Sequence, residues 1–587
     1  MSDLATELSA ACSAAFEAEG FEARWGAVRR SDRPELADFQ CNGCMGAAKS
    51  QGLVPRDLAA KIAERISGKG PIERVDVAGP GFLNIKVSGE ALSKQAEFIR
   101  ADEKAGGGTL EQTENVIIDF GGPNVAKPMH VGHLRSAVIG DTLVRLFRFL
   151  GDEVTGDAHL GDWGLQMGHL ITELFAEQPD LIYFKPDFEG PFPEEPPVTI
   201  EDLGRLYPQA SAKAKADPVR NEASQLAVAE MQAGHPGYRA LLRHFINVSV
   251  EALKIDYAFL GVEFDLWKGE SDVDGLIAGM VEDLKEKGLA KLDDGAWIID
   301  VARESDKKEM PPFMVINSRG GTGYHATDLA TIVDRVNELH PDRMLYVVDQ
   351  RQALHFEQVF RAADMAGLMA EDRMEHIGFG TVNGTDGKPF KTREGGVLRL
   401  ADLNRMALEE AEKKIGEAGL SGDITADERA NIAALVARAS LRFADLQNVR
   451  ATNYVFDLER FTSFEGKTGP YMLYAAVRIK SLLRRAKEAG HEPGAVTIER
   501  DTERALVLAM DGFAQALAQS HAKRQPHILC EHVYSLAQAF SALYADAPIA
   551  NETDAALRAS RLGLCEAVLK QLEAGLGILG IEAPERM

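Results

Sequence analysis

The chain has 587 residues, more than a single hydrophobic core accommodates, so three or four domains are expected. A hydrophobic share of 45% and a charged share of 26% are typical of an ordinary soluble protein. No run of apolar residues approaches the 18 that a membrane-spanning helix needs, which excludes a membrane span. The acidic N-terminus lacks the basic region of a signal peptide, and a cytoplasmic location is therefore expected.

The net charge of −25 is unusual for a protein that binds nucleic acid, because such binding relies on Lys and Arg side chains at phosphates. The charge is uneven, however. Residues 437–490 contain ten basic and five acidic residues, a local excess of about +5. Taken alone, such a run is most simply explained as the solvated face of a helix.

Residues 1–110 begin with an amphipathic pattern at Leu4, Leu8, Cys12 and Phe16, which predicts a helix. A second helix is predicted near residues 55–66. Short strands are predicted at 73–77 and 82–87 on either side of a Gly-Pro turn, and the AGGGT segment at 105–109 is a plausible linker. These elements predict a small α/β domain.

The remaining chain divides by pattern into a nucleotide-binding part and a helical part. Residues 176–300 resemble an insertion, with a Pro-rich loop followed by mostly helical periodicity. Residues 301–400 return to α/β character, with a buried strand at 344–348 and a helix from about 356 to 366. From about residue 425 the periodicity is helical to the end.

The segment 115–141 has the features of the first half of a nucleotide-binding unit. A short β-branched run at 116–120 predicts a buried parallel strand, and the breakers Gly-Gly-Pro-Asn follow it. A helix is then predicted, with phosphates expected at its N-terminus. One helix face is expected to be apolar; it comprises Val131, Leu134, Val138, Leu143, Leu146 and Phe147.

His130 and His133 stand one turn apart at that N-terminus, with Lys127 just upstream. Two histidines on a helix are more often structural than chemical, and the glutamate of a metal-binding HExxH is missing. Their place directly after a strand and a glycine turn favours a chemical role. Imidazoles there can donate hydrogen bonds to phosphate oxygens as charge develops during displacement of pyrophosphate.

Three other patterns have simpler explanations. Cys41 and Cys44 have metal-ligand spacing, but no second pair lies near them, so they are interpreted as ordinary thiols. A Walker A loop is absent, because Gly387-Lys388 is followed by proline. The glycine-flanked loop with Lys388, Lys391 and Arg393 suits closure over a triphosphate, yet alone it is indistinguishable from any exposed basic turn.

The motif PNVAKPMHVGHLRS at 123–136 resembles the HIGH signature of class I aminoacyl-tRNA synthetases, in the form characteristic of the arginyl-tRNA synthetase family. The resemblance extends along the whole chain. Similar segments, in the same order, are DFQCNGCMGAAK, VAGPGFLNIKV, HLGDWGLQMG, GYHATDLA, GPYMLYAAVRI and LGIEAPERM. Several independent motifs in the right order make a chance match very improbable.

The resemblance implies an α/β fold: a parallel-sheet, Rossmann-like catalytic domain at 111–400, with a connective insertion at 176–300. An N-terminal α/β domain at 1–110 would contact the tRNA at its D-loop corner, and an all-helical domain at 401–587 would bind the anticodon. The basic excess lies where that helical domain begins. The tRNA contacts expected there are Arg450, Arg478, Lys480 and Arg484.

The resemblance also implies a reaction. ATP with Mg²⁺, L-arginine and the cognate arginine tRNA would give arginyl-tRNA, AMP and pyrophosphate through an arginyl-adenylate. No editing of mischarged tRNA, no metal site of the protein's own, no membrane partner and a monomeric state are expected. The acidic total charge is no objection, because binding depends on the surface that faces the nucleic acid.

The family's arginine pocket can be transferred position by position, to Asn124, His130, Glu270, Tyr324, Asp328 and Gln352. Glu270 and Asp328 would contact the guanidinium, with Tyr324 beside it. Asn124 and His130 would meet the amino acid and the reaction centre, and Gln352 would contact the α-amino end. The chemistry agrees, because a planar fork of five donors matches carboxylates in bidentate geometry and a lysine does not.

The second class I signature, KMSKS, is degenerate here, since residues 389–393 read Pro-Phe-Lys-Thr-Arg. In arginyl enzymes with this loss, a lysine just before the HIGH motif compensates, and Lys127 is that residue. Lys127, His130 and His133 are therefore predicted to be catalytic. The predicted ATP contacts are Lys127, His130, Gly132, His133, Lys391 and Thr392.

Two other classes of function were weighed against this interpretation. One is another adenylyl-transferring enzyme with an HxGH site, for which the long helical C-terminus would have no use. The other is a synthetase-like RNA-binding module without catalysis, which the intact set of site residues disfavours.

Overall fold

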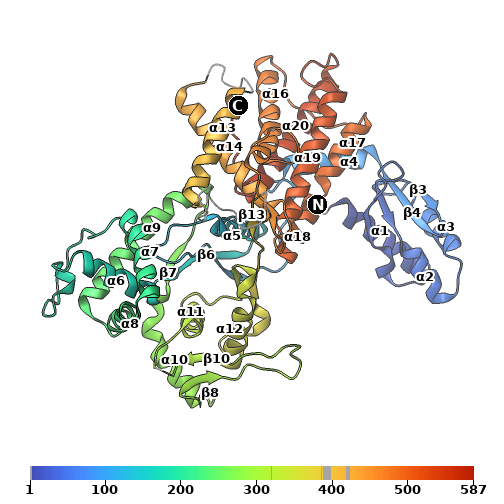
Figure 1. The fold of residues 1–587 in the computed structure, drawn as a ribbon. Helices are drawn as coiled ribbons and strands as arrows, with labels where there is room; N and C mark the ends of the chain where they lie inside the picture. The colour runs from blue at the N-terminus through green and yellow to red at the C-terminus, as the bar shows by residue number, and fades with distance from the viewer. Residues whose placement is uncertain (1–2, 319, 385–386, 388–397, 418–423) are drawn as a thin grey trace. The chain divides into compact units, whose positions relative to one another are not determined.

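A five-stranded parallel sheet of order β12-β11-β5-β6-β7 lies at the centre of residues 110–462 (Figure 1). The computed structural model describes residues 3–318, 320–384, 387, 398–417 and 424–587. The strands are β5 (Asn115–Phe120), β6 (Glu153–Leu160), β7 (Leu266–Gly269), β11 (Arg343–Val347) and β12 (Met374–His376). The predicted strands at 116–120 and 344–348 are confirmed, and the strand order reverses direction between β5 and β11.

Helix α5 (Val131–Leu150) follows β5 after the glycine turn, as predicted. All six residues of its predicted apolar face are buried, together with eight other residues of this 20-residue helix. Gly140 lets the helix approach the sheet, because a Cβ there would lie 2.2 Å from the Phe120 ring. Gly151 ends the helix in the left-handed conformation at φ 113°.

Between β6 and β7 the chain is helical, in agreement with the predicted pattern. The helices are α6 (Leu165–Glu177), η2 (Ile182–Phe184), α7 (Ile200–Ala216), α8 (Pro218–Gln232) and α9 (Pro236–Leu260). The range 176–300, which resembles an insertion, also contains β7, an edge strand of the central sheet. After β7 come η3 (Glu270–Val273), α10 (Asp274–Glu286) and an antiparallel sheet of β8 (Ala290–Asp293), β9 (Ala296–Ile299) and β10 (Phe313–Ile316).

The second half of this unit packs α11 (Tyr324–Leu339) and α12 (Ala353–Met365) around a core that includes Phe313, Tyr346 and Phe360. The helix predicted at 356–366 thus begins three residues earlier, directly after η4 (Gln350–Gln352). The remaining elements are η5 (Glu371–Arg373), β13 (Val382–Asn383), α13 (Leu400–Glu417), α14 (Ala426–Leu446), β14 (Tyr454–Val455) and α15 (Leu458–Phe461).

Two buried ion pairs join α14 to α5. Arg442 donates to Asp141 at 2.6 Å, and Arg135 lies 3.1 Å from Asp445. Both guanidinium groups are almost completely excluded from solvent. Arg442 belongs to the basic run at 437–490, so part of that excess is internal and is not a solvated helix face.

A second compact unit comprises residues 1–109 and 463–587. Its sheet is antiparallel, with order β1-β2-β4-β3: β1 (Val28–Arg30), β2 (Phe39–Cys41), β3 (Ile72–Ala78) and β4 (Phe82–Val87). Its N-terminal helices are α1 (Leu4–Ala18), η1 (Ala23–Gly26), α2 (Gly43–Gln51), α3 (Pro55–Ile66) and α4 (Gly89–Ala101). The predicted helices and strands of this region are therefore confirmed, and the apolar face of α1 is buried.

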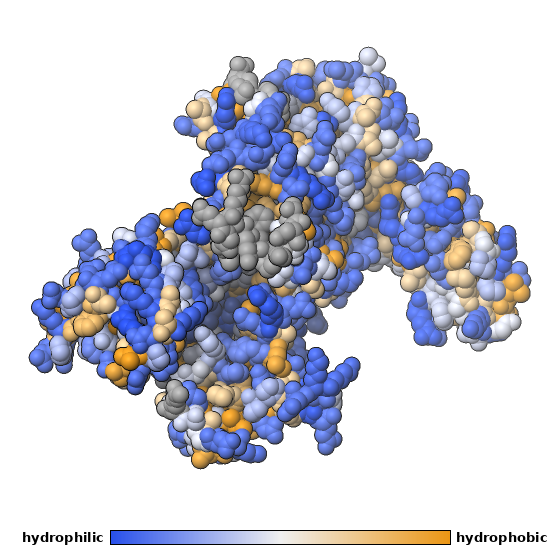
Figure 2. Space-filling view, in the orientation of Figure 1, coloured by the Kyte–Doolittle hydropathy of each residue, from blue (hydrophilic) through white to orange (hydrophobic). Residues whose placement is uncertain are grey.

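The C-terminal part of this unit is helical, as predicted (Figure 1). Its helices are α16 (Gly469–Glu488), α17 (Asp501–Asp511), α18 (Phe513–Lys523), α19 (His527–Asp546) and α20 (Ala555–Ile578). Figure 2 shows a mostly hydrophilic face, with hydrophobic residues in separate small patches. Among the helices in the described part of the chain, none is long and apolar enough to cross a bilayer. The five cysteines are buried.

Candidate active site

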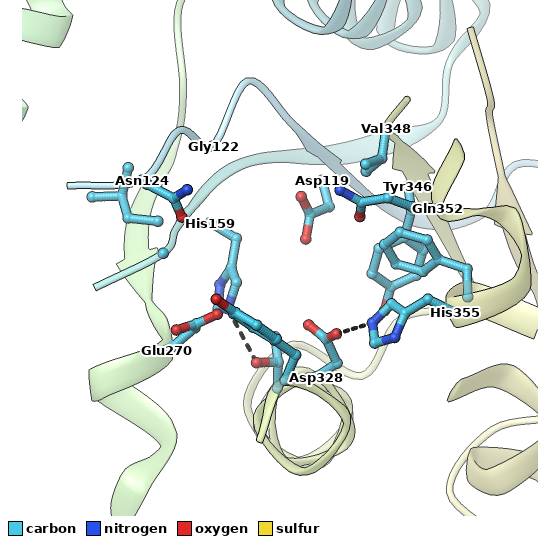
Figure 3. Close-up of a pocket in the computed structure, with 15 residues that line it drawn as sticks. Asp119, Gly122, Asn124, His159, Glu270, Asp328, Tyr346, Val348, Gln352 and His355 are labelled. Carbon is cyan, nitrogen blue, oxygen red and sulfur yellow. Dashed lines mark hydrogen bonds and ion pairs between the residues drawn. The ribbon is translucent and has the colours of Figure 1, made fainter. Parts of the chain in front are cut away.

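A cavity of about 400 Å³ opens at the carboxyl ends of β5, β6 and β11, where ligands bind in parallel α/β sheets (Figure 3). Five of the residues predicted to bind arginine line it. They come from four separate segments: Asn124, Glu270, Tyr324 with Asp328, and Gln352. The fold thus brings together side chains that are more than 200 positions apart in the sequence.

Glu270 is held in place by the loop after β6. The backbone N–H of Trp163 donates to its Oε2 at 3.3 Å. The next residue, Ser271, is held by Asp162. The Asp162 carboxylate accepts hydrogen bonds from the Ser271 backbone N–H at 2.8 Å and from the Ser271 hydroxyl at 2.5 Å. Burial, followed by the charges of Asp328 and Asp162, raises the pKa of Glu270 to about 8.

Tyr324 and Asp328 stand four residues apart on α11 and therefore face the same side of the helix. Tyr324 is 63% exposed, at the mouth of the cavity. The Nε2 atom of His355, on α12, forms a short hydrogen bond with Oδ2 of Asp328 (Figure 3). His355 also lines the cavity, and the sequence had not singled it out.

Beneath the cavity, the buried guanidinium of Arg335 donates to Asp119 and Asp157 at 2.6 Å each. His159 lies beside them, with its Nε2 3.2 Å from the Thr331 hydroxyl. Sequence reasoning missed the lining residues Asp119, His159, Thr331, Tyr346 and His355. Asp119 and His159 lie at the carboxyl ends of β5 and β6, so strand position was a usable signal for these two.

His130 and His133 cap the N-terminus of α5 reciprocally. The Gly132 N–H donates to Nδ1 of His130, and the His130 N–H donates to Nδ1 of His133, each at 3.0 Å. Because both Nδ1 atoms accept, the hydrogen of each neutral ring is on Nε2. Gly132 is required for this geometry, since a Cβ there would lie 2.7 Å from the His130 ring.

The electrostatic surroundings keep both imidazoles neutral. Desolvation, then the charges of Arg351 and Lys127, lowers the pKa of His130. Burial, together with His130 and Lys127, lowers the pKa of His133 to about 3. Near pH 7 each ring is consequently an uncharged hydrogen-bond donor through Nε2.

Lys127 lies close enough to affect both histidines, and its Nζ is 4.6 Å from the centre of the Tyr207 ring, on α7. The described lining of the cavity does not include Lys127, His130 or His133. His130 was predicted to contact both arginine and ATP. It lies beside His133 at the N-terminus of α5 and is not among the described residues that line the cavity. Lys391 and Thr392, also predicted to contact ATP, lie outside the described residues.

The four predicted tRNA contacts differ in their availability. Arg450 donates to the Gly378 carbonyl at 2.6 Å, within the unit that holds the cavity. Arg478 lies over the rings of Tyr474 and Tyr544. Lys480 pairs with Glu573 and Glu585 at 2.9 and 2.8 Å. Arg484 is exposed, beside Lys487 and His491.

Across the described ranges, no group of three or more His, Cys, Asp or Glu side chains is arranged to hold a metal ion.

Comparison with known families assigns these features to a class of enzyme. Residues 96–458 match the model of the class I tRNA synthetase (R) catalytic domain. Residues 472–587 match the DALR anticodon binding domain, and residues 2–87 the arginyl tRNA synthetase N-terminal domain. The parallel sheet, the HxGH helix and the cavity thus form the catalytic domain of a class I aminoacyl-tRNA synthetase.

The relatives define the family. The arginine–tRNA ligase of Hyphomonas neptunium is 68% identical over 589 residues, and that of Maricaulis maris is 57% identical over 588, each covering 100% of both chains. The arginyl-tRNA synthetase structures from Plasmodium falciparum (22% identity, TM-score 0.81) and Thermus thermophilus (23%, 0.79) share the fold over 100% of both chains. The chain belongs to the arginyl-tRNA synthetase family. The predicted resemblance and fold class are confirmed.

Proposed function

We propose that the protein attaches L-arginine to its cognate tRNA, using ATP. The α-carboxylate of arginine attacks the α-phosphorus of ATP, the bond to pyrophosphate breaks, and arginyl-adenylate forms. A ribose hydroxyl at the tRNA end then attacks the activated carbonyl, and AMP leaves with the bonding electrons. The observation that supports this assignment most strongly is the acidic cavity at the strand ends, next to two neutral histidines at a helix N-terminus.

In this proposal the guanidinium of arginine binds between Glu270 and Asp328. One oxygen of each carboxylate already accepts a hydrogen bond from the protein, which leaves the other oxygen for the substrate. Binding of the cation favours the ionised form of Glu270, so arginine displaces the proton that the high pKa retains. Asn124 and Gln352 bind the α-amino end, and Tyr324 borders the cavity.

ATP binds with its phosphates at the N-terminus of α5. The Nε2–H groups of His130 and His133 donate to phosphate oxygens as negative charge moves toward pyrophosphate. Because the pKa of His133 is about 3, its ring is neutral near pH 7. The Nε2–H of a neutral imidazole donates a hydrogen bond without transferring its proton. Lys127 takes the place of the signature lysines, since residues 389–393 have no lysine at either lysine position of KMSKS. Gly132, Lys391 and Thr392 complete the proposed contacts.

Mg²⁺ belongs to the proposed reaction as the companion of ATP. Octahedral Mg²⁺ usually keeps several waters and binds phosphate oxygens, so the protein needs few ligands of its own.

For tRNA recognition we propose the domain boundaries 1–110, 111–400 and 401–587, with 176–300 as a connective insertion. The first and third domains contact the tRNA, with Arg484 as an exposed contact. Arg450, Arg478 and Lys480 act from positions where they also have partners within the protein. We further propose a cytoplasmic monomer without editing activity, properties testable by sedimentation and by incubation with mischarged tRNA.

The deciding experiment is ATP–pyrophosphate exchange with arginine, with and without arginine tRNA. Exchange that depends on arginine and on the tRNA is the expected result. Failure to exchange in the presence of tRNA would exclude the enzymatic function. Exchange with a different acid and no tRNA requirement would favour another adenylyl-transferring enzyme.

A further inference from the structure

His355 lies in the first turn of α12, lines the cavity and forms a hydrogen bond with the Asp328 carboxylate (Figure 3). We propose that His355 is a positioning residue that fixes the Asp328 carboxylate for the guanidinium, and thereby sets the affinity for arginine. This inference rests on the proposed function, because it assumes that Asp328 receives the guanidinium. His355 itself acts through Asp328 and takes no part in the adenylation step.

The His355 ring is held by its neighbours on two sides. It lies edge-to-face with His325, with ring centres 4.8 Å apart, and with Phe356 at 5.4 Å. His325 in turn is 3.4 Å from the amide oxygen of Gln358, whose amide nitrogen donates to the Pro311 carbonyl at 2.7 Å. A series of contacts therefore runs from backbone to Asp328, and the imidazole cannot turn away without losing them.

The consequence for Asp328 is a fixed orientation of its carboxylate. Its Oδ2 is bonded to His355, whereas Oδ1 accepts no hydrogen bond from the described residues and lies toward the cavity (Figure 3). A carboxylate torsion is otherwise broad, and ordering it on binding costs free energy. His355 makes that restriction part of the folded structure, so arginine meets a preorganised acceptor.

Glu270 provides a parallel that supports this interpretation. Its Oε2 accepts from the Trp163 backbone N–H, and its other oxygen has no hydrogen-bond partner among the described contacts. The cavity thus offers the guanidinium two carboxylates, each anchored through one oxygen. The anchor of Glu270 is backbone, but that of Asp328 is a replaceable side chain, which makes the inference testable by mutation.

The test compares His355→Asn with His355→Gln. The Gln amide nitrogen reaches the place of Nε2 and keeps the donor, whereas the Asn nitrogen reaches only the place of Nδ1. In tRNA-dependent exchange, His355→Asn should raise the KM for arginine about tenfold, the effect of one lost charge-assisted hydrogen bond. The KM for ATP and kcat should stay within about twofold, and His355→Gln should stay close to wild type.

A double-mutant cycle supplies the second readout. In an Asp328→Ala background, His355→Asn should have no further effect on the KM for arginine, because the carboxylate that His355 positions is absent. His340→Asn, at the exposed end of α11, is the matched control and should behave like wild type. Equal increases in KM for arginine from His355→Asn and His355→Gln, or a rise for ATP alongside arginine, would overturn the inference.

Calorimetric titration of arginine separates this inference from the proposed function. A wild-type protein that binds arginine but does not exchange pyrophosphate would refute the function, while the dissociation constants of the variants would still test His355. If wild type binds no arginine, both fail. Should His355→Asn not fold, His355→Gln decides: weakened arginine binding in that variant overturns the inference.

Discussion

In the cavity and at the N-terminus of α5, burial and nearby charges shift the pKa of a side chain in opposite directions. In the cavity, burial and neighbouring carboxylates raise the pKa of Glu270 to about 8. At the N-terminus of α5, burial, followed by the effects of His130 and Lys127, lowers the pKa of His133 to about 3. Each region therefore disfavours charge on its key side chain before a substrate arrives. In the proposed reaction, the cation of arginine enters the first region and the phosphate anions of ATP lie at the second.

The two regions also differ in how the chain builds them. The helix N-terminus is made from one contiguous segment, Lys127 to His133, whereas the cavity needs residues as distant as Asp119 and His355. Variants in the two regions should accordingly alter different kinetic constants. That separation can be challenged by four experiments, taken here in order of expected effect.

The largest effect is expected for His133→Ala. It removes a donor aimed at developing charge, and kcat for exchange should fall about 100- to 1,000-fold. The KM for arginine should stay unchanged, because His133 is not among the described lining residues of the cavity. His340→Ala, an exposed histidine, is the control. A raised KM for arginine would show that the two regions are not separate.

Asp328→Asn should act in the other region. Losing a charge-assisted contact to the guanidinium should lower kcat/KM for arginine about 100-fold, mainly through KM. Steady-state exchange at varied arginine and ATP measures both constants. Glu338→Gln removes one negative charge from the exposed face of the same helix and should leave them unaltered. An equal loss in the control would indicate a long-range charge effect.

Lys127→Ala tests whether Lys127 compensates for the missing lysines of the KMSKS signature. Loss of one cation at the phosphates should lower kcat about 30-fold, and Lys391→Ala should do less. Aminoacylation rates of the two variants give the comparison. Near-normal activity in Lys127→Ala, with activity abolished in Lys391→Ala, would reverse the assignment of these lysines.

The smallest expected effect is a pH dependence confined to the cavity. With a pKa of about 8, Glu270 is mostly protonated at pH 7, and its binding form accumulates as the pH rises. The KM for arginine should therefore fall about tenfold from pH 7 to pH 9 and then level off. Glu270→Gln should raise KM and flatten this profile. A KM that increases over the same interval would contradict the sign of the shift.

Local patterns in the sequence predicted much of the fold. The strand at 116–120 follows from a short run of β-branched residues, and the helix from Val131 follows from helical periodicity. Recognised motifs located Glu270 and Asp328, which would otherwise pass for surface acids. His355 and Arg335 escaped prediction because their roles come from partners that only the tertiary structure brings near. The same limit applies to Arg442, whose charge is neutralised by Asp141, 301 positions away.

The buried pairs Arg442–Asp141 and Arg135–Asp445 hold α5 and α14 together, so the two helices should move as one rigid body. Removing one partner of such a pair leaves a charge uncompensated in the interior, at a cost of about 3–5 kcal/mol. A displacement of α14 should therefore move α5 as well, and with it the two imidazoles at the N-terminus of α5. Asp445 and Arg442 lie 310 and 301 positions along the chain from their partners Arg135 and Asp141.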